Sequence, residues 1–331
     1  MRWSETRRIR WRAFDLGVRM TTCSTSPWLR RYAAFVSFAT FLLIIAGALV
    51  TSNDAGLSVP DWPTSFGTFR MPRMVGGVKF EHGHRMIAGT VSILMIVLAL
   101  WLWKREPRRW VRRLGALAVV TVLAQAVLGG ITVLFYLPVA ISVSHACLAQ
   151  IFFCLTVSVA LFTRCDWQWD QQRLQDSATP SLRQLAAGTS AAVFLQLLLG
   201  AAFRHKGFGI SPHIVGAVVV TGGVLWLLVR ILTKYPRDRA LVRPVLLLTA
   251  LLVVQMGLGG ASYFLKMSAM NTPQPLSPLI EITAAHVAVG ALVLASTLVS
   301  TLQVFRNVAA PPIIRGARAE QERERLAASR P

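Results

Sequence analysis

The chain has 331 residues, of which 54% are hydrophobic and only 15% are charged. Lysine and arginine number 35 against 14 acidic residues, which is a formal excess of +21 at pH 7. This composition excludes the pair of ordinary soluble domains that the length alone would allow. On a soluble chain the basic excess would indicate nucleic-acid binding, but on so apolar a chain it must first be compared with membrane topology.

Eight apolar runs are each long enough for a helix to cross the hydrocarbon core of a membrane, which takes about 20 residues. They lie at 33–52, 85–103, 114–134, 142–163, 185–203, 212–232, 245–265 and 282–304. The sequence therefore predicts an all-α membrane protein with eight transmembrane helices.

The basic residues concentrate on one side of this arrangement. If both termini share a side, that side holds 28 of the 35 lysines and arginines, in the tails at 1–32 and 305–331 and in alternate loops. Basic loops stay in the cytoplasm, so we expect both termini to be cytoplasmic. The charge excess then follows from topology, no nucleic-acid partner is expected, and the short loops favour a bacterial cytoplasmic membrane.

The chain also repeats itself. A glutamine four residues before a glycine occurs in the third, fifth and seventh runs, at 125–129, 196–200 and 255–259. Both residues then lie on one helix face, where the glycine allows close approach and the amide can bond to a neighbouring helix. The repeat is parallel rather than inverted and predicts two four-helix bundles, at 33–164 and 185–304, joined by a cytoplasmic linker at 165–184.

Four of the six histidines lie in the first turns of the even-numbered runs, at one depth near the outer face: His84, His145, His213 and His286. Ionisable residues inside a membrane span usually mark function. Zinc and copper sites more often combine histidine with cysteine and carboxylate ligands, whereas two neutral imidazoles from different helices suit the axial positions of a haem iron. Each half is therefore predicted to hold one haem, and His82 and His205 are interpreted as loop residues.

Three basic residues are available at the same depth to bind haem propionates: Arg85, Arg204 and Lys206. Propionates are anions, and charge-assisted bonds to arginine or lysine would hold them. The alternative interpretation is that these three are solvated charges of the outer surface.

The two halves differ in the loop before their second helix. That loop covers 53–84 in the first half and only 204–211 in the second. The longer loop places Glu81 one helical turn before His84, while 208–210 contains no acid. The carboxylate predicts a catalytic haem site in the first half and an electron-carrying haem in the second. The alternative is an acid favoured by the helix dipole, and Glu281 before His286 shows that acidity is not unique to the first half.

Several motifs together carry a resemblance to a known family. The first outer loop contains Pro60-Asp61-Trp62-Pro63, and the second helix begins with Glu81-x-x-His84-Arg85. The Gln-x-x-Leu-Gly-Gly of the third run and the histidines of the fourth, sixth and eighth runs follow in order. Along 33–304 the chain resembles the haem A synthase family, most specifically through the Asp-Trp-Pro loop combined with Glu-x-x-His-Arg.

The resemblance implies an oxidoreductase that converts the C8 methyl group of haem O into the formyl group of haem A by successive hydroxylations, with water as the oxygen source. It implies that His213 and His286 hold a haem b cofactor, and that His84 and His145 hold the substrate iron beside Glu81. Glu81 would stabilise positive charge or accept a proton, and the sequence leaves both roles open. Many members carry cysteine pairs in the outer loops, but here Val59 stands where a cysteine is often found.

The implied partners are haem O, a haem O synthase, an electron acceptor and membrane lipid, and a homo-oligomer is compatible with the sequence. The residues alone leave two further functions open. One is a dihaem b-type cytochrome that carries electrons from quinol, and the other is a haem transport or insertion factor. Asp61 is interpreted mainly as a cap of its own loop that holds Trp62 against a haem edge or the membrane surface.

Overall fold

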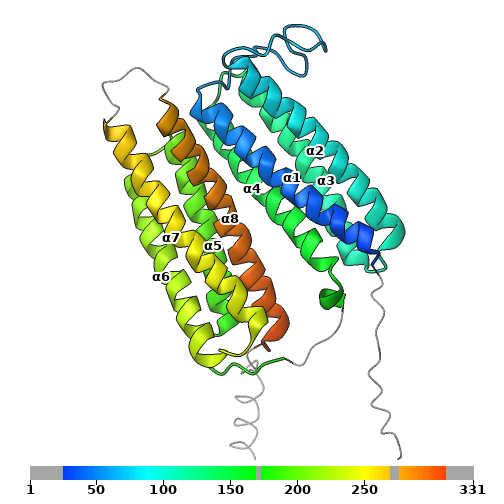
Figure 1. Cartoon of the computed structure of the whole chain (residues 1–331), viewed down its shortest axis with the longest axis vertical. Coiled ribbons are helices and arrows are strands. Elements are labelled where there is room, and N and C mark those ends of the chain that lie inside the picture. The colour runs from blue at the N-terminus through cyan, green and yellow to red at the C-terminus, as the bar shows by residue number, and fades with distance from the viewer. Residues whose placement is uncertain (1–24, 169–172, 269–275, 311–331) are drawn as a thin grey trace, which may run out of the picture.

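The computed structural model describes residues 25–168, 173–268 and 276–310. Each of its eight long helices is apolar enough to cross a membrane, which confirms the predicted all-α, multi-pass fold (Figure 1). Most of the predicted tails at 1–32 and 305–331 lies outside the described residues. The elements are α1 (Pro27–Ser52), α2 (Val78–Arg105), α3 (Arg109–Leu134), α4 (Val139–Phe162), a short 3-10 helix η1 (Cys165–Gln168), α5 (Leu182–Arg204), α6 (Ser211–Lys234), α7 (Arg239–Ser268) and α8 (Ser277–Asn307).

The helices extend beyond the apolar runs, and this matters most in α2. That helix begins at Val78, well before the predicted start at 85, because the polar residues of its first two turns hide it from a search for apolar runs. His82 is therefore a helical residue, and its interpretation as a loop residue was wrong. Its Nδ1 lies 2.9 Å from the hydroxyl oxygen of Ser65. His205 does lie outside a helix, directly after α5.

Helices that follow one another in sequence pack side by side in two groups (Figure 1). We call α1 to α4 the N-terminal bundle and α5 to α8 the C-terminal bundle, since each forms a closed ring of contacts. Among the described residues, no close backbone contact joins the diagonal helices α2 and α4, or α6 and α8. The two bundles meet through α1 and α4 of one and α5 and α8 of the other.

The main clusters of buried apolar side chains lie toward one end of each bundle. In α2 the buried apolar residues begin at Val91, and in α6 they begin at Val220. In α7 they end at Leu252. These side chains form the main apolar clusters, whose burial from water and lipid holds the helices together. The opposite end of each bundle, where α2, α4, α6 and α8 begin, has no such cluster among its described residues.

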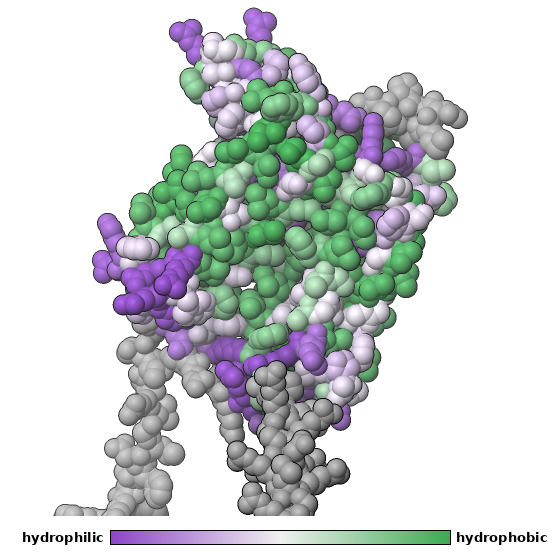
Figure 2. All heavy atoms as spheres, turned by 180° about the vertical axis from the view of Figure 1, so that it is seen from behind, coloured by the Kyte–Doolittle hydropathy of each residue, from purple (hydrophilic) through white to green (hydrophobic). Residues whose placement is uncertain are grey.

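The outer surface fits a membrane environment. Figure 2 shows apolar side chains over the middle of the molecule and polar side chains gathered toward its two ends. Large apolar residues such as Leu100, Val229 and Val253 are more than half exposed. Lipid tails solvate such side chains without the cost that water would impose.

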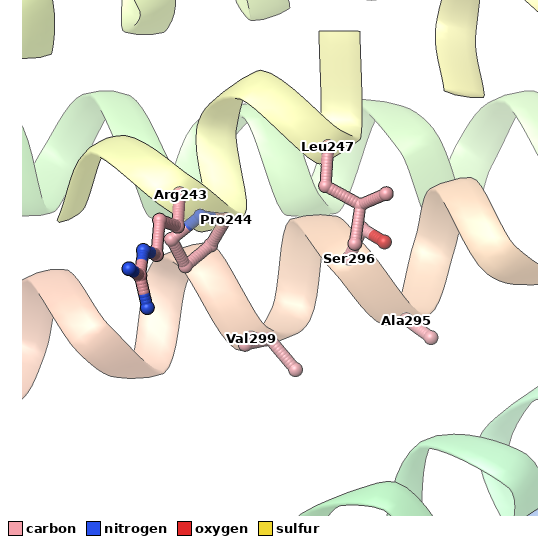
Figure 3. Close-up of a pocket in the computed structure, with 6 residues that line it drawn as sticks. All are labelled: Arg243, Pro244, Leu247, Ala295, Ser296 and Val299. Atoms are coloured by element: carbon pink, nitrogen blue, oxygen red, sulfur yellow. The ribbon is translucent and has the colours of Figure 1, made fainter. Parts of the chain in front are cut away.

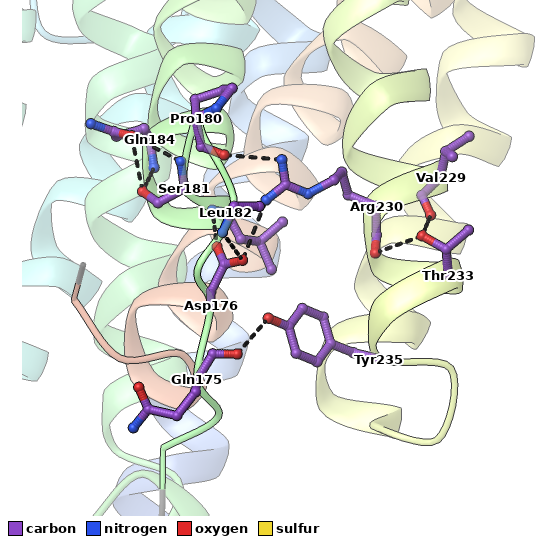
Figure 4. Close-up of polar contacts among 11 residues, drawn as sticks. Gln175, Asp176, Pro180, Ser181, Leu182, Gln184, Val229, Arg230, Thr233 and Tyr235 are labelled. Carbon is purple, nitrogen blue, oxygen red and sulfur yellow. Dashed lines mark hydrogen bonds and ion pairs between the residues drawn. The ribbon is translucent and has the colours of Figure 1, made fainter. Parts of the chain in front are cut away.

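The linker between the bundles is bound to the C-terminal bundle. Arg230 of α6 donates to the carbonyl oxygen of Pro180 at 2.9 Å and lies 3.4 Å from the carboxylate of Asp176 (Figure 4). The hydroxyl of Tyr235 donates to the carbonyl oxygen of Gln175 at 3.0 Å. The same end has a groove of about 290 Å³ between α7 and α8, lined by Arg243, Pro244, Leu247, Ala295, Ser296 and Val299 (Figure 3).

Candidate functional site

The four histidines predicted to bind haem lie within the first three turns of their helices. His84 and His145 are in the second turns of α2 and α4, His213 is in the first turn of α6, and His286 is in the third turn of α8. Consecutive helices are antiparallel, so the even-numbered helices all begin at one end of the molecule. We call this the histidine end, and it is the end that lacks a buried apolar cluster.

Each imidazole lies against a glycine of the preceding helix. A Cβ atom built on that glycine would lie only 2.9–3.1 Å from Cε1 of the ring. Such a contact is too close for a larger residue unless the ring moves, so the glycine makes room for the imidazole. The four pairs are Gly47 with His84, Gly129 with His145, Gly200 with His213, and Gly259 with His286.

The glutamines of the sequence repeat bond to the histidine helices. The amide nitrogen of Gln125 donates to the carbonyl oxygen of His145 at 2.9 Å, and that of Gln196 donates to the carbonyl oxygen of His213 at 2.8 Å. Gln255 approaches the ring of His286 itself, with Nε2 to Nε2 at 3.3 Å. The prediction that these amides bond across helix contacts is confirmed for Gln125 and Gln196.

The two histidines of the C-terminal bundle have a spacing that fits one iron between them. Their ring centres are 6.3 Å apart and their planes differ by 78°, although α6 and α8 are diagonal helices. A metal–imidazole bond measures about 2 Å and the ring centre lies about 1 Å beyond the nitrogen, so imidazoles on opposite sides of one metal have centres about 6 Å apart. Together with the missing apolar cluster, this spacing fits a haem.

In the N-terminal bundle, a buried ion pair lies beside His84. Glu81 Oε1 accepts from Arg85 Nη2 at 2.6 Å, and Glu81 Oε2 accepts from the backbone N–H of Val59 at 2.8 Å. The side chains of Glu81 and Arg85 are 5% and 17% exposed. The arginine also donates to the carbonyl oxygens of Val59, Asp61 and Thr64. Both carboxylate oxygens of Glu81 are thus engaged, and the ion pair ties the start of α2 to the preceding loop.

That loop, residues 53–77, covers the histidine end of the N-terminal bundle. The carboxylate of Asp61 accepts from the backbone N–H groups of Phe66 and Gly67 at 2.7 and 2.9 Å. A hydrogen bond from the Thr64 hydroxyl, supported by these backbone bonds, lowers the pKa of Asp61 below its ordinary value. Asp61 therefore caps its own loop, as predicted. Trp62 packs on Gly130 of α3, where a Cβ would lie 2.5 Å from the indole ring.

The three predicted propionate contacts are not gathered into one basic cluster. Arg204 lies between the bundles, where it donates to the carbonyl oxygen of Ala48 at 3.1 Å and to the hydroxyl of Ser52 at 2.7 Å. That hydroxyl is in turn 2.9 Å from the hydroxyl of Thr283 in α8. Lys206 is exposed in the turn after α5. No sequence signal indicated Ser52 or Thr283, since isolated hydroxyl residues are common in membrane helices.

Comparison with known proteins finds a match to one protein family. The COX15-CtaA family, described as "Cytochrome oxidase assembly protein", matches residues 30–212, which is more than half of the chain. This segment includes Glu81, His84 and His145, whereas His213 and His286 lie beyond it.

Curated relatives named "Heme A synthase" align over shorter stretches. The protein of Lysinibacillus sphaericus is 34% identical over 110 residues, which cover 33% of this chain and 36% of the relative. That of Exiguobacterium sibiricum is 26% identical over 178 residues, covering 53% and 59%. That of Brucella anthropi is 30% identical over 146 residues, covering 39% and 40%. The aligned part thus spans between about a third and three fifths of these relatives. The resemblance read from the motifs is confirmed, and the chain belongs to the COX15-CtaA family of cytochrome oxidase assembly proteins.

Proposed function

We propose that this protein is a haem A synthase, which oxidises the C8 methyl group of haem O to a formyl group. The family and the names of the curated relatives support this assignment. The observation that carries it is an asymmetry between two similar bundles. Both bundles set two histidines against glycines, but among the described residues only the N-terminal bundle has a buried carboxylate, that of Glu81, at the start of a histidine helix.

The C-terminal bundle would hold the permanent cofactor, a haem b, through His213 and His286. Their ring spacing fits a shared iron, and α6 itself has no buried apolar residue before Val220. A haem bound there supplies reversible one-electron transfer. Arg204 bonds to α1 from the end of α5, so the second bundle is fixed against the first at the depth of both histidine pairs.

The N-terminal bundle would hold the iron of haem O between His84 and His145. Conversion of the methyl group takes one water molecule and releases four electrons and four protons, in two successive two-electron oxidations. Each oxygen of Glu81 accepts one hydrogen bond, from Arg85 or from Val59, and one lone pair on each oxygen stays available for a proton. The two bonds also fix the carboxylate as a negative charge that orients the loop over the site.

The remaining features of the proposal concern placement and partners. We place the protein in a bacterial cytoplasmic membrane with both termini in the cytoplasm, and divide it into two repeated halves at 33–164 and 185–304. A haem O synthase would supply the substrate, and an electron acceptor would take the electrons. A homo-oligomer remains compatible with this arrangement.

Pigment analysis tests the function directly. The full chain is expressed in membranes that contain a haem O synthase, and the haems are extracted and separated. We expect haem A from the wild type, and a loss of at least about 100-fold with Glu81→Ala, while the spectrum of the bound b-type haem persists. The matched control is Glu281→Ala, because Glu281 also precedes a histidine but is exposed. Unmodified haem alone from the wild type would instead indicate a cytochrome or a haem carrier.

A further inference from the structure

The four glycine–histidine contacts differ in the residue that lies one helical turn before the glycine. In α3, α5 and α7, a glutamine precedes the contact glycine by four residues. In α1 the same position is Leu43, four residues before Gly47. Leu43 packs with the apolar cluster of the N-terminal bundle and has no atom that can accept a hydrogen bond. His84 is therefore the one histidine of the four whose neighbouring helix offers no amide.

At the other three contacts, both the histidine ring and the glutamine amide have a buried polar atom without a hydrogen-bond partner. In the described structure, the Nδ1 atoms of all four histidines are buried without a hydrogen-bond partner. The amide oxygens of Gln125, Gln196 and Gln255 are also buried and unpartnered. Buried polar atoms are seldom left unpaired. A ring nitrogen and an amide oxygen thus lie unsatisfied at the same helix contact in three places, and at the fourth only the ring nitrogen does.

Iron binding would make these atoms complementary. A neutral imidazole that binds iron through Nε2 carries its proton on Nδ1, which becomes a hydrogen-bond donor. Histidines that bind metals almost always donate this proton to a neighbouring acceptor, which fixes the tautomer and makes the ligand more basic. The amide oxygens of Gln125 and Gln196 are such acceptors, because their amide nitrogens already bond to the histidine helices at His145 and His213. The amide of Gln255 lies instead at Nε2 of His286, at 3.3 Å.

We propose that Gln125 and Gln196 are positioning residues that accept the Nδ1 proton of the neighbouring histidine when it binds haem iron. Leu43 leaves His84 without this support, so His84 is the ligand that gives way when substrate haem enters and product haem leaves. This inference rests on the proposed function. It gives each site one histidine supported by an amide, His145 in the substrate site and His213 in the cofactor site, and it leaves His84 as the exchangeable ligand of the substrate site.

The first test concerns the cofactor site and uses the purified full-length protein. Gln196→Leu should transfer its haem to apomyoglobin about 10–100-fold faster than the wild type. The reduction potential of that haem should rise, because a less basic imidazole stabilises the oxidised iron less. Gln196→Glu retains an acceptor oxygen and should reverse both changes.

Thr189→Val is the matched control for that test. Thr189 is a buried polar residue of α5 that also packs against a glycine of α6, Gly223, but it lies away from His213. If the buried glutamine had only a structural role, Thr189→Val should change the haem-transfer rate and the reduction potential in the same way. If Gln196→Leu keeps the haem-transfer rate and potential of the wild type, the inference is wrong.

The second test concerns the substrate site and does not require enzyme activity. Haem b is titrated into protein whose C-terminal site is already filled, as a probe of the second site. Leu43→Gln should bind this second equivalent about 10–100-fold more tightly than the wild type, and Gln125→Leu should bind it correspondingly less tightly. Unchanged affinity in Leu43→Gln would overturn the exchangeable role of His84. A wild type without any low-spin haem would instead overturn the proposed function on which both tests rest.

Discussion

The two bundles use the same histidine contacts but close their histidine ends differently. In the N-terminal bundle, the loop 53–77 folds over the end and is tied to α2 by Arg85, whose guanidinium binds three backbone carbonyls and Glu81. In the C-terminal bundle, only the short segment 205–210 joins α5 to α6, and no acid occurs in it. The neighbouring Arg204 reaches across to α1 rather than over its own bundle.

Under the proposed function, this difference lets one scaffold serve as a catalytic site in one bundle and as a cofactor site in the other. The glycine contacts set the position of an imidazole, and they are the same in both bundles. A catalytic site requires two further features, a charged group held away from water and a segment that controls access to the site. The added loop supplies both to the N-terminal bundle, since it binds the carboxylate of Glu81 through Val59. A bundle without such a loop is suited to holding a group permanently.

Removing single histidines should separate the bundles most sharply. His286→Ala takes one axial ligand from the proposed cofactor site, so we expect the bound b-type haem to fall to less than about a tenth of the wild-type content. His145→Ala should keep that haem and its spectrum but abolish haem A formation. His205→Ala, which changes a residue at the end of α5, should alter neither. Equal loss of bound haem in His145→Ala and His286→Ala would contradict separate roles for the bundles.

Breaking the arginine contacts should affect the loop of one bundle only. Arg85→Leu leaves the buried Glu81 carboxylate without its cation, a change that costs about 3–5 kcal/mol of stability. We therefore expect proteases to cut within 66–74 and the yield of haem A to drop. Arg230→Leu removes the ion pair with Asp176 at the other end of the molecule and serves as the control. It should destabilise the linker and leave the 53–77 loop resistant, as judged by fragment masses after limited digestion.

The sequence predicted the parts of the site that leave a periodic or compositional trace. Apolar runs predicted eight helices, and the helical spacing of Gln125 and Gly129 predicted a shared face that the structure bears out. The start of α2 was missed because its first turns are polar. The partners of Arg85 and Arg204 were missed for another reason. They are mostly backbone carbonyls, which every residue has, so no residue type at the receiving end signals the contact.

A smaller effect should reveal how the loop itself is held. Hydrogen bonds lower the pKa of Asp61 from its ordinary 3.8, so its carboxylate stabilises the folded loop at higher pH, and this contribution is lost as the pH falls through the lowered value. Asp61→Asn removes the contribution at every pH. Pepsin, which works in acid, should therefore cut the loop of the variant faster than that of the wild type near pH 5. The difference should shrink toward pH 3 and below, because the wild-type carboxyl is then increasingly protonated.

Asp238→Asn, which changes a similar turn before α7, should show no difference in the 53–77 loop. A rate difference for Asp61→Asn that persists unchanged in strong acid would mean that the ionised carboxylate does not hold the loop, and the contacts of Arg85 alone would then account for its order.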